Sequence, residues 1–358
     1  MNEIWILGAT GRSGRAIAAR LAASGAALVL VGRDAERLRE LAATIGGTPR
    51  TVVADSVGAV AARLAAAGPA VVVNTIGPFT GTAVPLARAC PPGSHYVDLA
   101  NELSAVTGLL ALHDEAAAAG RCLVTGAGFG VLGTESVVLK LCADRPAVTR
   151  VRVDALPMVE EEPGRIGSAL AGSMVDALAG GGRRYEHGRL VRARLGGDFE
   201  RFTLPDGSAA EAMGAPTGEL EAARRATGAP FVVAGSGMVP AGRAIRAVLP
   251  VVAALLSLPP LGNSAKRRLA RTRVTPRERT REFSWARARV EGSDGSVREG
   301  WMRTGEAMAF TSAVTAEVAR RLAGGEGRPG AYTPGALFGP ELAAKAGGQF
   351  LLGDAPTP

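Results

Sequence analysis

The chain has 358 residues, enough for two domains of ordinary size, and its 47% hydrophobic content indicates a folded globular protein. The formal net charge is +8, but basic and aromatic residues are not interleaved in a recognisable module, so we expect no nucleic-acid partner. The three cysteines lack metal-ligand spacing and the three histidines are dispersed, so we expect no bound metal.

The first stretch of the chain predicts a strand, a glycine-rich turn and a helix. An apolar strand over residues 4–7 leads into the turn at 8–14 and a helix over 12–24. Glycine permits a tight turn, close approach of the main chain to phosphate, and close packing of the helix on the strand. The free amides at the helix start favour negative charge. The pattern predicts a site for a dinucleotide pyrophosphate, with a merely structural turn as the alternative, and the residues assigned to the site are Gly8, Thr10, Gly11, Arg12, Ser13 and Gly14.

The next two strands end in charged residues that bear on the choice of cofactor. After the strand at 28–31 comes Arg33, where NAD-specific sites place an acidic residue, and a guanidinium there can pair with a 2′-phosphate. We therefore expect NADP(H) rather than NAD; Asp34 can also simply cap the helix at 35–45. Asp55 follows the strand at 51–54. It either contacts the adenine or caps the helix at 56–67, and the sequence leaves both open.

A β-branched strand over residues 70–73 is typical of a buried parallel sheet. Ligands of such sheets bind at the carboxyl ends of the strands. The turn after this strand is therefore predicted to lie beside the nicotinamide half of the cofactor, with an ordinary strand-to-helix loop before a helix at 82–89 as the alternative. The residues assigned to this contact are Asn74, Thr75, Gly77, Pro78 and Phe79.

The rest of the chain changes rhythm near residue 149. Strands at 95–98 and 121–125, a helix through 119 and a glycine-rich loop at 126–133 complete a Rossmann-type doubly wound parallel sheet, of class α/β, over residues 1–145. Alternating strands then predict an α+β domain with a mixed or antiparallel sheet over residues 146–325. Its expected elements are strands from 149 and at 281–290 and 297–303, the last two joined as a hairpin, and helices near 168–178, 217–226 and 306–322.

Residues 231–261 are unusually apolar. The uncharged run within them is too short to span a bilayer, and prolines interrupt the region. We expect a buried or dimer-interface helix here, which would make a homodimer possible. A peripheral membrane contact or a tunnel for an apolar substrate is the alternative. The odd number of cysteines and a start that leads directly into the first strand favour a cytoplasmic protein.

Four blocks together resemble the saccharopine dehydrogenase-like reductases, most closely the bacterial branch that includes trans-acting enoyl reductases. The blocks are residues 8–14, 74–79, 95–102 and 330–339. The resemblance implies an NADP-dependent reductase with an inserted sheet domain and a C-terminal segment, residues 326–358, that packs back on the first domain. We expect residues 330–334 to form a loop and the tail from Asp354 to be disordered.

Hydride transfer needs a cofactor, a substrate held against it and often one acid. The Tyr-x-x-x-Lys pair of short-chain dehydrogenases is absent. The catalytic candidates are Tyr96 and Asp98, which alternation places on one face of a strand, with Glu102 nearby. Asp98 can instead cap a helix or anchor the Asn74 turn, and Glu135 is expected to cap a helix. We expect an NADP-dependent oxidoreductase that reduces the C=C bond of an apolar enoyl small-molecule substrate; an imine, C–N or amino-acid dehydrogenase activity, or a non-catalytic NADP-sensing protein, are the alternatives.

Overall fold

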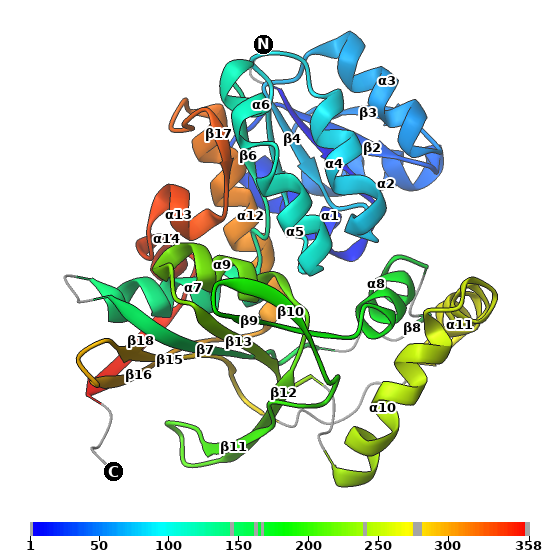
Figure 1. The fold of residues 1–358 in the computed structure, drawn as a ribbon. Helices are drawn as coiled ribbons and strands as arrows, with labels where there is room; N and C mark the ends of the chain where they lie inside the picture. The colour runs from blue at the N-terminus through cyan, green and yellow to red at the C-terminus, as the bar shows by residue number, and fades with distance from the viewer. Residues whose placement is uncertain are drawn as a thin grey trace. The chain divides into compact units, whose positions relative to one another are not determined.

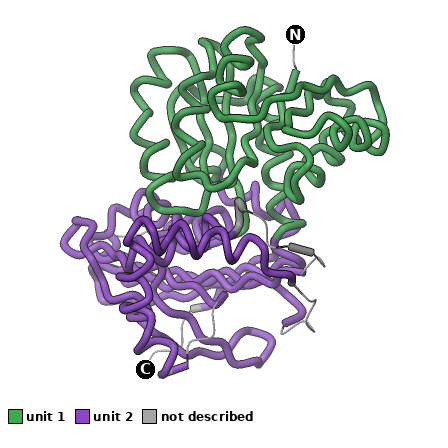
Figure 2. The backbone as a smooth tube through the Cα atoms, turned by 90° about the vertical axis from the view of Figure 1, so that its right-hand side faces the viewer, with its two compact units in different colours: residues 1–129, 308–338 green, residues 130–307, 339–358 purple. Residues whose placement is uncertain are grey.

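The computed structural model describes residues 3–143, 147–160, 164–165, 168–238, 242–274 and 281–354, and the chain divides into two compact units (Figure 1). Unit 1 comprises Met1–Phe129 and Met308–Phe338, and unit 2 comprises Gly130–Ala307 and Gly339–Pro358 (Figure 2). The chain therefore passes between the units three times.

Unit 1 is built on a seven-stranded sheet in the order β17-β6-β5-β4-β1-β2-β3, in which every paired strand is parallel. Six of these strands have the order typical of a dinucleotide-binding sheet, in which the strand order, not the strand direction, reverses between β1 and β4. The strands are β1 (Ile4–Leu7), β2 (Leu28–Gly32), β3 (Arg50–Val53), β4 (Val71–Asn74), β5 (His95–Asp98), β6 (Cys122–Val124) and β17 (Gly330–Tyr332).

Helices follow the strands of this sheet in the alternation that the sequence predicts. Every residue of β1, β2 and β4 is buried, as expected for a parallel sheet covered on both faces. The helices are α1 (Arg12–Ala23), α2 (Ala35–Ile45), α3 (Val57–Ala67), α4 (Phe79–Ala89), α5 (Leu103–Leu110), α6 (His113–Ala118), α12 (Ala307–Ala323) and α13 (Pro334–Phe338).

The C-terminal part of unit 1 corrects two expectations. The segment after residue 330, expected as a loop, forms β17 and pairs with β6, where the Thr125 amide donates to the Tyr332 carbonyl oxygen at 3.0 Å. Helix α12, expected in the second domain, packs in unit 1 through the Thr315 hydroxyl, which donates to the Ala127 carbonyl oxygen at 2.7 Å. These long-range contacts assign residues 308–338 to unit 1. Residues 339–358, which were also expected to pack on the first domain, belong to unit 2 instead.

The glycine-rich stretch at 126–133, also expected as a loop, already contains the start of α7 (Phe129–Cys142), most of which belongs to unit 2. A Cβ on Gly300 would lie 3.1 Å from Leu141 and 3.2 Å from Val137, so α7 packs closely on the second sheet. That packing outweighs the low helix propensity of Gly130 and Gly133.

Unit 2 holds a nine-stranded mixed sheet in the order β10-β9-β13-β7-β15-β16-β18, with β12 pairing β13 and β11 pairing β12. Among the described strands of this second sheet, only β13 and β7 pair in parallel. The predicted hairpin is confirmed as β15 and β16. The strands are β7 (Val148–Leu156), β9 (Gly182–Glu186), β10 (Arg189–Ala193), β11 (Glu200–Thr203), β12 (Ala209–Gly214), β13 (Phe231–Ser236), β15 (Ser284–Gly292), β16 (Val297–Thr304) and β18 (Gln349–Asp354).

The remaining elements of unit 2 are helices and one small two-stranded ladder. Helices α8 and α9 confirm the two helices predicted in this region. The elements are α8 (Ser168–Ala179), α9 (Gly218–Thr227), α10 (Arg243–Leu256), α11 (Pro259–Arg271), α14 (Glu341–Lys345), β8 (Gly164–Arg165) and β14 (Arg273–Val274).

The apolar stretch over residues 231–261 is not one buried helix. It begins as strand β13, continues as α10 and turns into α11, and the side chains of Val248, Val251 and Leu255 are about half exposed or more. Of the expected buried or dimer-interface helix, the buried alternative is therefore wrong for α10, and the dimer-interface alternative stays a prediction. The disordered tail was expected to begin at Asp354, but this residue ends β18; residues 355–358 lie outside the described part of the chain.

Candidate functional site

The glycine turn between β1 and α1 is packed against itself. Gly8 has a φ of +74°, a conformation that favours glycine, and the Gly11 amide donates to the Gly8 carbonyl oxygen at 2.9 Å. A Cβ on Gly14 would lie 2.4 Å from that same oxygen and 2.8 Å from the Ala9 Cα. Any side chain at position 14 would therefore clash with the backbone of the turn.

The first turn of α1 fits a phosphate group. Its N-cap is Gly11, and no side chain caps the helix in the described structure. The two neighbouring helices are capped by their own side chains, α2 by Asp34 and α3 by Ser56. Since the first amides of a helix need an acceptor, the start of α1 suits an anionic ligand. The half-buried Thr10, Arg12 and Ser13 surround this helix start.

The loop after β4 is fastened to the glycine turn. The Thr75 hydroxyl donates to the carbonyl oxygens of Leu7 at 2.8 Å and Gly8 at 3.2 Å. Within the loop, the Asn74 Oδ1 accepts from the Ile76 amide at 2.9 Å. The structure therefore brings the two predicted contact blocks, residues 8–14 and 74–79, together at the carboxyl ends of β1 and β4, where the strand order reverses.

The far end of this loop is held by Glu102, which the sequence suggested as a candidate catalytic acid. The Glu102 Oε1 accepts a hydrogen bond of 3.4 Å from the Phe79 amide at the start of α4, and its Oε2 accepts one of 3.2 Å from the Asn101 amide. Gly77 and Pro78 are half-buried beside it, and Phe79 is buried.

Tyr96 and Asp98 lie on one face of β5, as predicted, and the Tyr96 hydroxyl donates to the Asp98 Oδ2 at 3.0 Å. The Asn74 Nδ2 in turn donates to the Tyr96 hydroxyl at 2.9 Å. The other oxygen of Asp98 accepts from the Thr125 hydroxyl at 2.8 Å and from the amides of Ala100 and Gly126. This network joins the carboxyl ends of β4, β5 and β6.

Burial sets the protonation of both groups. Neither Tyr96 nor Asp98 has exposed surface. Desolvation raises the pKa of Asp98 to about 6, against the four hydrogen bonds that lower it, and raises the pKa of Tyr96 well above its usual value. The geometry favours the anchoring alternative for Asp98, in which it supports the Asn74 turn. A catalytic role for Tyr96 and Asp98 stays a prediction.

The two charged residues predicted near the adenine end follow neighbouring strands. Gly32 of β2 pairs with Val53 of β3, so Arg33 and Asp55 both come just beyond the same edge of the sheet, and both are exposed. Asp34 caps α2 by accepting from the amides of Glu36 and Arg37. The cap of α3 is Ser56, which accepts from the Ala59 amide, so the capping alternative for Asp55 is wrong.

One further expectation, that for Glu135, is settled by helix α7. Glu135 lies in the middle of α7 and is buried, so it does not cap that helix. Sequence reasoning missed Thr125, which holds Asp98, and Thr82, whose hydroxyl donates to the Ile76 carbonyl oxygen at 2.5 Å. Their signal was a hydroxyl directly after β6 and one turn into α4.

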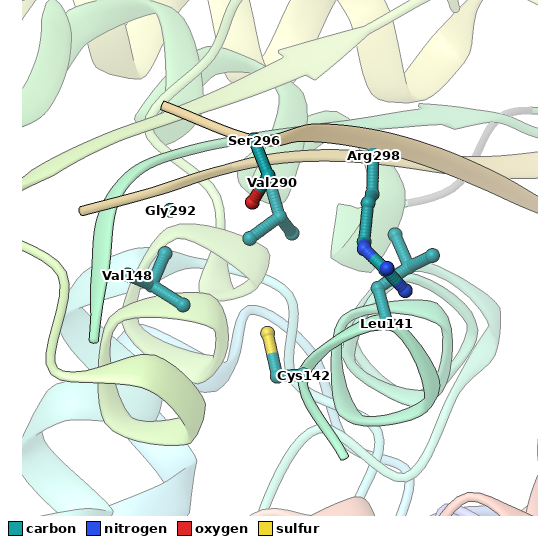
Figure 3. A pocket seen from close by; sticks show the side chains of 7 residues that line it. All are labelled: Leu141, Cys142, Val148, Val290, Gly292, Ser296 and Arg298. Carbon is teal, nitrogen blue, oxygen red and sulfur yellow. The ribbon is translucent and has the colours of Figure 1, made fainter. Parts of the chain in front are cut away.

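A small hollow in unit 2 includes none of these residues (Figure 3). It measures about 10 Å³, room for about one water molecule. It is lined by Leu141, Cys142, Val148, Val290, Gly292, Ser296 and Arg298. Within the described parts of the chain, no three histidine, cysteine or acidic side chains are placed to hold a metal ion.

Comparison with known proteins agrees with this geometry. Residues 3–102 match the model of the family described as NADP oxidoreductase, coenzyme F420-dependent. These residues form an oxidoreductase domain of the nicotinamide-nucleotide type. The match covers β1 to Glu102, and so includes the glycine turn, the Asn74 loop and the Tyr96–Asp98 pair.

Part of the chain is similar to curated enzymes. A trans-acting enoyl reductase of Mycobacterium leprae (strain TN) is 35% identical over 146 residues, which is 39% of this chain and 35% of the relative. Another of Mycobacterium tuberculosis (strain ATCC 25618 / H37Rv) is 34% identical over the same share. The chain thus spans about a third of the length of the curated relatives that it matches.

The fold of the whole chain is that of saccharopine dehydrogenase. The apo, histidine-tagged enzyme (L-Glu forming) from Saccharomyces cerevisiae superposes with a TM-score of 0.61 at 13% identity, covering 99% of this chain and 100% of the other. The resemblance inferred from the four sequence blocks is confirmed at this level, and the predicted fold class with it.

Proposed function

We propose that this chain binds NADP(H) along the carboxyl ends of β1 to β4 and reduces the C=C bond of an apolar enoyl substrate. The observation that carries the proposal is the uncapped start of α1 beside the Gly8 turn, to which Thr75 fastens the Asn74 loop. The choice of bond rests on the similarity to proteins named trans-acting enoyl reductases.

Each part of the site has a separate task in this proposal. The amides at the start of α1 hold the pyrophosphate, and the Arg33 guanidinium pairs with the 2′-phosphate. The Asn74 loop, held by Thr75 at one end and Glu102 at the other, supports the nicotinamide. The bound cofactor supplies the hydride, and the protein supplies binding and orientation.

Titration with NADPH and NADH tests the cofactor. We expect NADPH to bind more tightly, because a charge-assisted hydrogen bond to phosphate is worth about 1.5–3 kcal/mol, or about tenfold and more in affinity. Arg33→Ala should remove this preference. Arg39→Ala is the control, since Arg39 is also an exposed arginine and lies on α2. Equal binding of both nucleotides by the parent chain would refute the role of Arg33.

Turnover tests the reaction. NADPH oxidation is followed with an enoyl thioester and, separately, with a cyclic imine. Oxidation with the enoyl compound alone supports the proposal. Oxidation with the imine alone would assign C–N chemistry instead, and tight NADPH binding without turnover on a broad panel would favour an NADP-sensing protein.

A further inference from the structure

Helix α10 presents an apolar face to solvent. Ile245, Val248, Val251 and Leu255 are 41%, 55%, 60% and 49% exposed, and their spacing of three or four residues places them on one side of the helix. Leu258 and Leu261, 50% and 45% exposed, continue the face around the corner into α11. We call these six residues the α10 face.

The opposite side of each helix is held by unit 2, which fixes the direction of the α10 face. The Arg246 guanidinium stacks 3.9 Å from the centre of the Phe199 ring, and Ala253 is buried. On α11, the Lys266 ammonium pairs with the Asp176 carboxylate of α8 at 2.6 Å. The exposed apolar side chains are therefore a fixed feature of the folded unit.

The sequence segment that contains the α10 face has charged residues of positive sign only. No aspartate or glutamate occurs from residue 222 to 277. Arg267, Arg268 and Arg271 of α11 are exposed, and no described residue forms an ion pair with them. An apolar face that is followed by a helix with three exposed arginines is complementary to an apolar surface that carries anions.

These helices do not form a span. Among the described residues no single helix is long and apolar enough to cross a membrane, and only the bent pair Ala244–Leu256 and Pro259–Arg271, with 110° between its members, passes on length and composition. The 14 residues of α10 measure about 21 Å, less than the bilayer core of about 30 Å. The geometry suits a helix lying along a surface.

We propose that the α10 face and the α11 arginines bind the surface of an anionic lipid bilayer. The aliphatic side chains enter the boundary between headgroups and acyl chains, and Arg267, Arg268 and Arg271 pair with lipid phosphates. A second copy of the chain is disfavoured as the occupant, because a symmetric contact through this face brings the same cations together. The face also lacks the aromatic side chains that dominate protein–protein contacts.

Flotation of the full chain with vesicles tests the proposal independently of the proposed reaction. We expect binding to vesicles of phosphatidylcholine with about a third phosphatidylglycerol, weak binding to phosphatidylcholine alone, and release by high salt. Each cation near an anionic surface contributes about fivefold in partitioning. A variant with Arg267→Gln, Arg268→Gln and Arg271→Gln should therefore bind at least tenfold more weakly.

Two matched controls separate this surface from general effects of charge and exposure. Arg189→Gln, Arg192→Gln and Arg194→Gln remove the same charge from other exposed positions of unit 2 and should leave binding unchanged. Leu255→Asp should abolish binding, whereas Leu190→Asp, at a 42% exposed position on β10, should not. Thermal midpoints within a few degrees of the parent establish that each variant is folded.

Three results would overturn the proposal. The first is no flotation with anionic vesicles. The second is flotation that the two arginine triples weaken equally. The third is a lipid-free dimer in sedimentation that Leu255→Asp converts to a monomer, which would assign the face to a second copy.

Discussion

Asp98 shows how one buried carboxylate organises three strand ends. Its two oxygens accept hydrogen bonds from the side chains of Tyr96 and Thr125 and from two backbone amides. Because Tyr96 accepts from Asn74, a change at Asp98 is transmitted to the loop that we place beside the nicotinamide. The carboxylate is therefore a positioning group in this geometry, and its loss should appear first in cofactor binding.

Asp98→Asn tests that role. The amide nitrogen cannot accept from the Tyr96 hydroxyl, so we expect weaker NADPH binding and a higher KM for NADPH, with a smaller change in kcat. Steady-state kinetics with a direct binding titration measure both. A large fall in kcat at unchanged NADPH affinity would instead support Asp98 as the proton donor.

The same substitution should change the pH dependence of stability. Burial raises the pKa of Asp98 from 3.8 to about 6, so between these values the folded state binds more protons than the unfolded state. The contribution is fully present below pH 3.8 and is lost as the pH rises through about 6. Thermal midpoints across this range should fall more steeply for the parent than for Asp98→Asn. Parallel curves would contradict the buried, protonated carboxyl.

Gly14→Ala should disrupt the glycine turn. The added methyl group would meet the Gly8 carbonyl oxygen at 2.4 Å and the Ala9 Cα at 2.8 Å, both backbone atoms. We expect a loss of about 1–3 kcal/mol of stability and weaker NADPH binding. Gly58→Ala is the control, because that helical glycine faces open space and its replacement should stabilise α3 by about 0.5–1 kcal/mol. Calorimetry and nucleotide titration give both quantities.

At the scale of elements, the helix caps show that Asp34 and Asp55 have different roles. Asp34 caps α2, whereas α3 is capped by Ser56 and leaves Asp55 to the exposed edge. Asp34→Ala should therefore cost about 1 kcal/mol of stability, or about 2–4 °C in the midpoint. Asp55→Ala should leave the midpoint unchanged and weaken nucleotide binding. The reverse pattern would show that Asp55 holds the fold.

The sequence was informative where periodicity and turn chemistry are local. Residues 28–31 and 70–73 are continuous apolar runs, so the strands β2 and β4 were predictable, as was the hairpin of β15 and β16. Strands β9 to β12 were missed because arginine and glutamate interrupt their apolar alternation. Arg184, for example, lies in β9 and pairs with Glu186 and Asp198, so its charge is satisfied by folding.

The site was predictable to the same extent. Gly8, Gly14 and the Asn74 loop were identified because their residue types indicate the local backbone conformation that each position needs. The partnership of Asn74 with Tyr96 and of Asp98 with Thr125 depends on strand order, which local patterns do not contain. The same limit explains why β17 was taken for a loop: three residues gain strand geometry only from pairing with β6.

At the scale of the whole molecule, the nucleotide-binding unit is discontinuous. A fragment of residues 3–145 lacks α12 and β17, so β6 becomes an unprotected edge and the contacts of Thr125 and Ala127 with the later segment are lost. We expect this fragment to aggregate. Residues 3–129 joined by a flexible linker to 308–338 should be soluble and bind NADPH.

Size-exclusion chromatography and NADPH titration of the two fragments measure this difference. Equal solubility and affinity would show that the later segment adds nothing to the unit.

The pairing of β17 with β6 also bears on how such chains diversify. Recombination that replaces everything between Phe129 and Met308 leaves the ladder of the parallel sheet untouched. The last strand, β18, hydrogen-bonds to β16 inside the exchanged part, so an exchange that keeps this pairing has to include residues 339–358 as well. We therefore expect residues 130–307 and 339–358 to share one evolutionary origin, and residues 1–129 and 308–338 to share another.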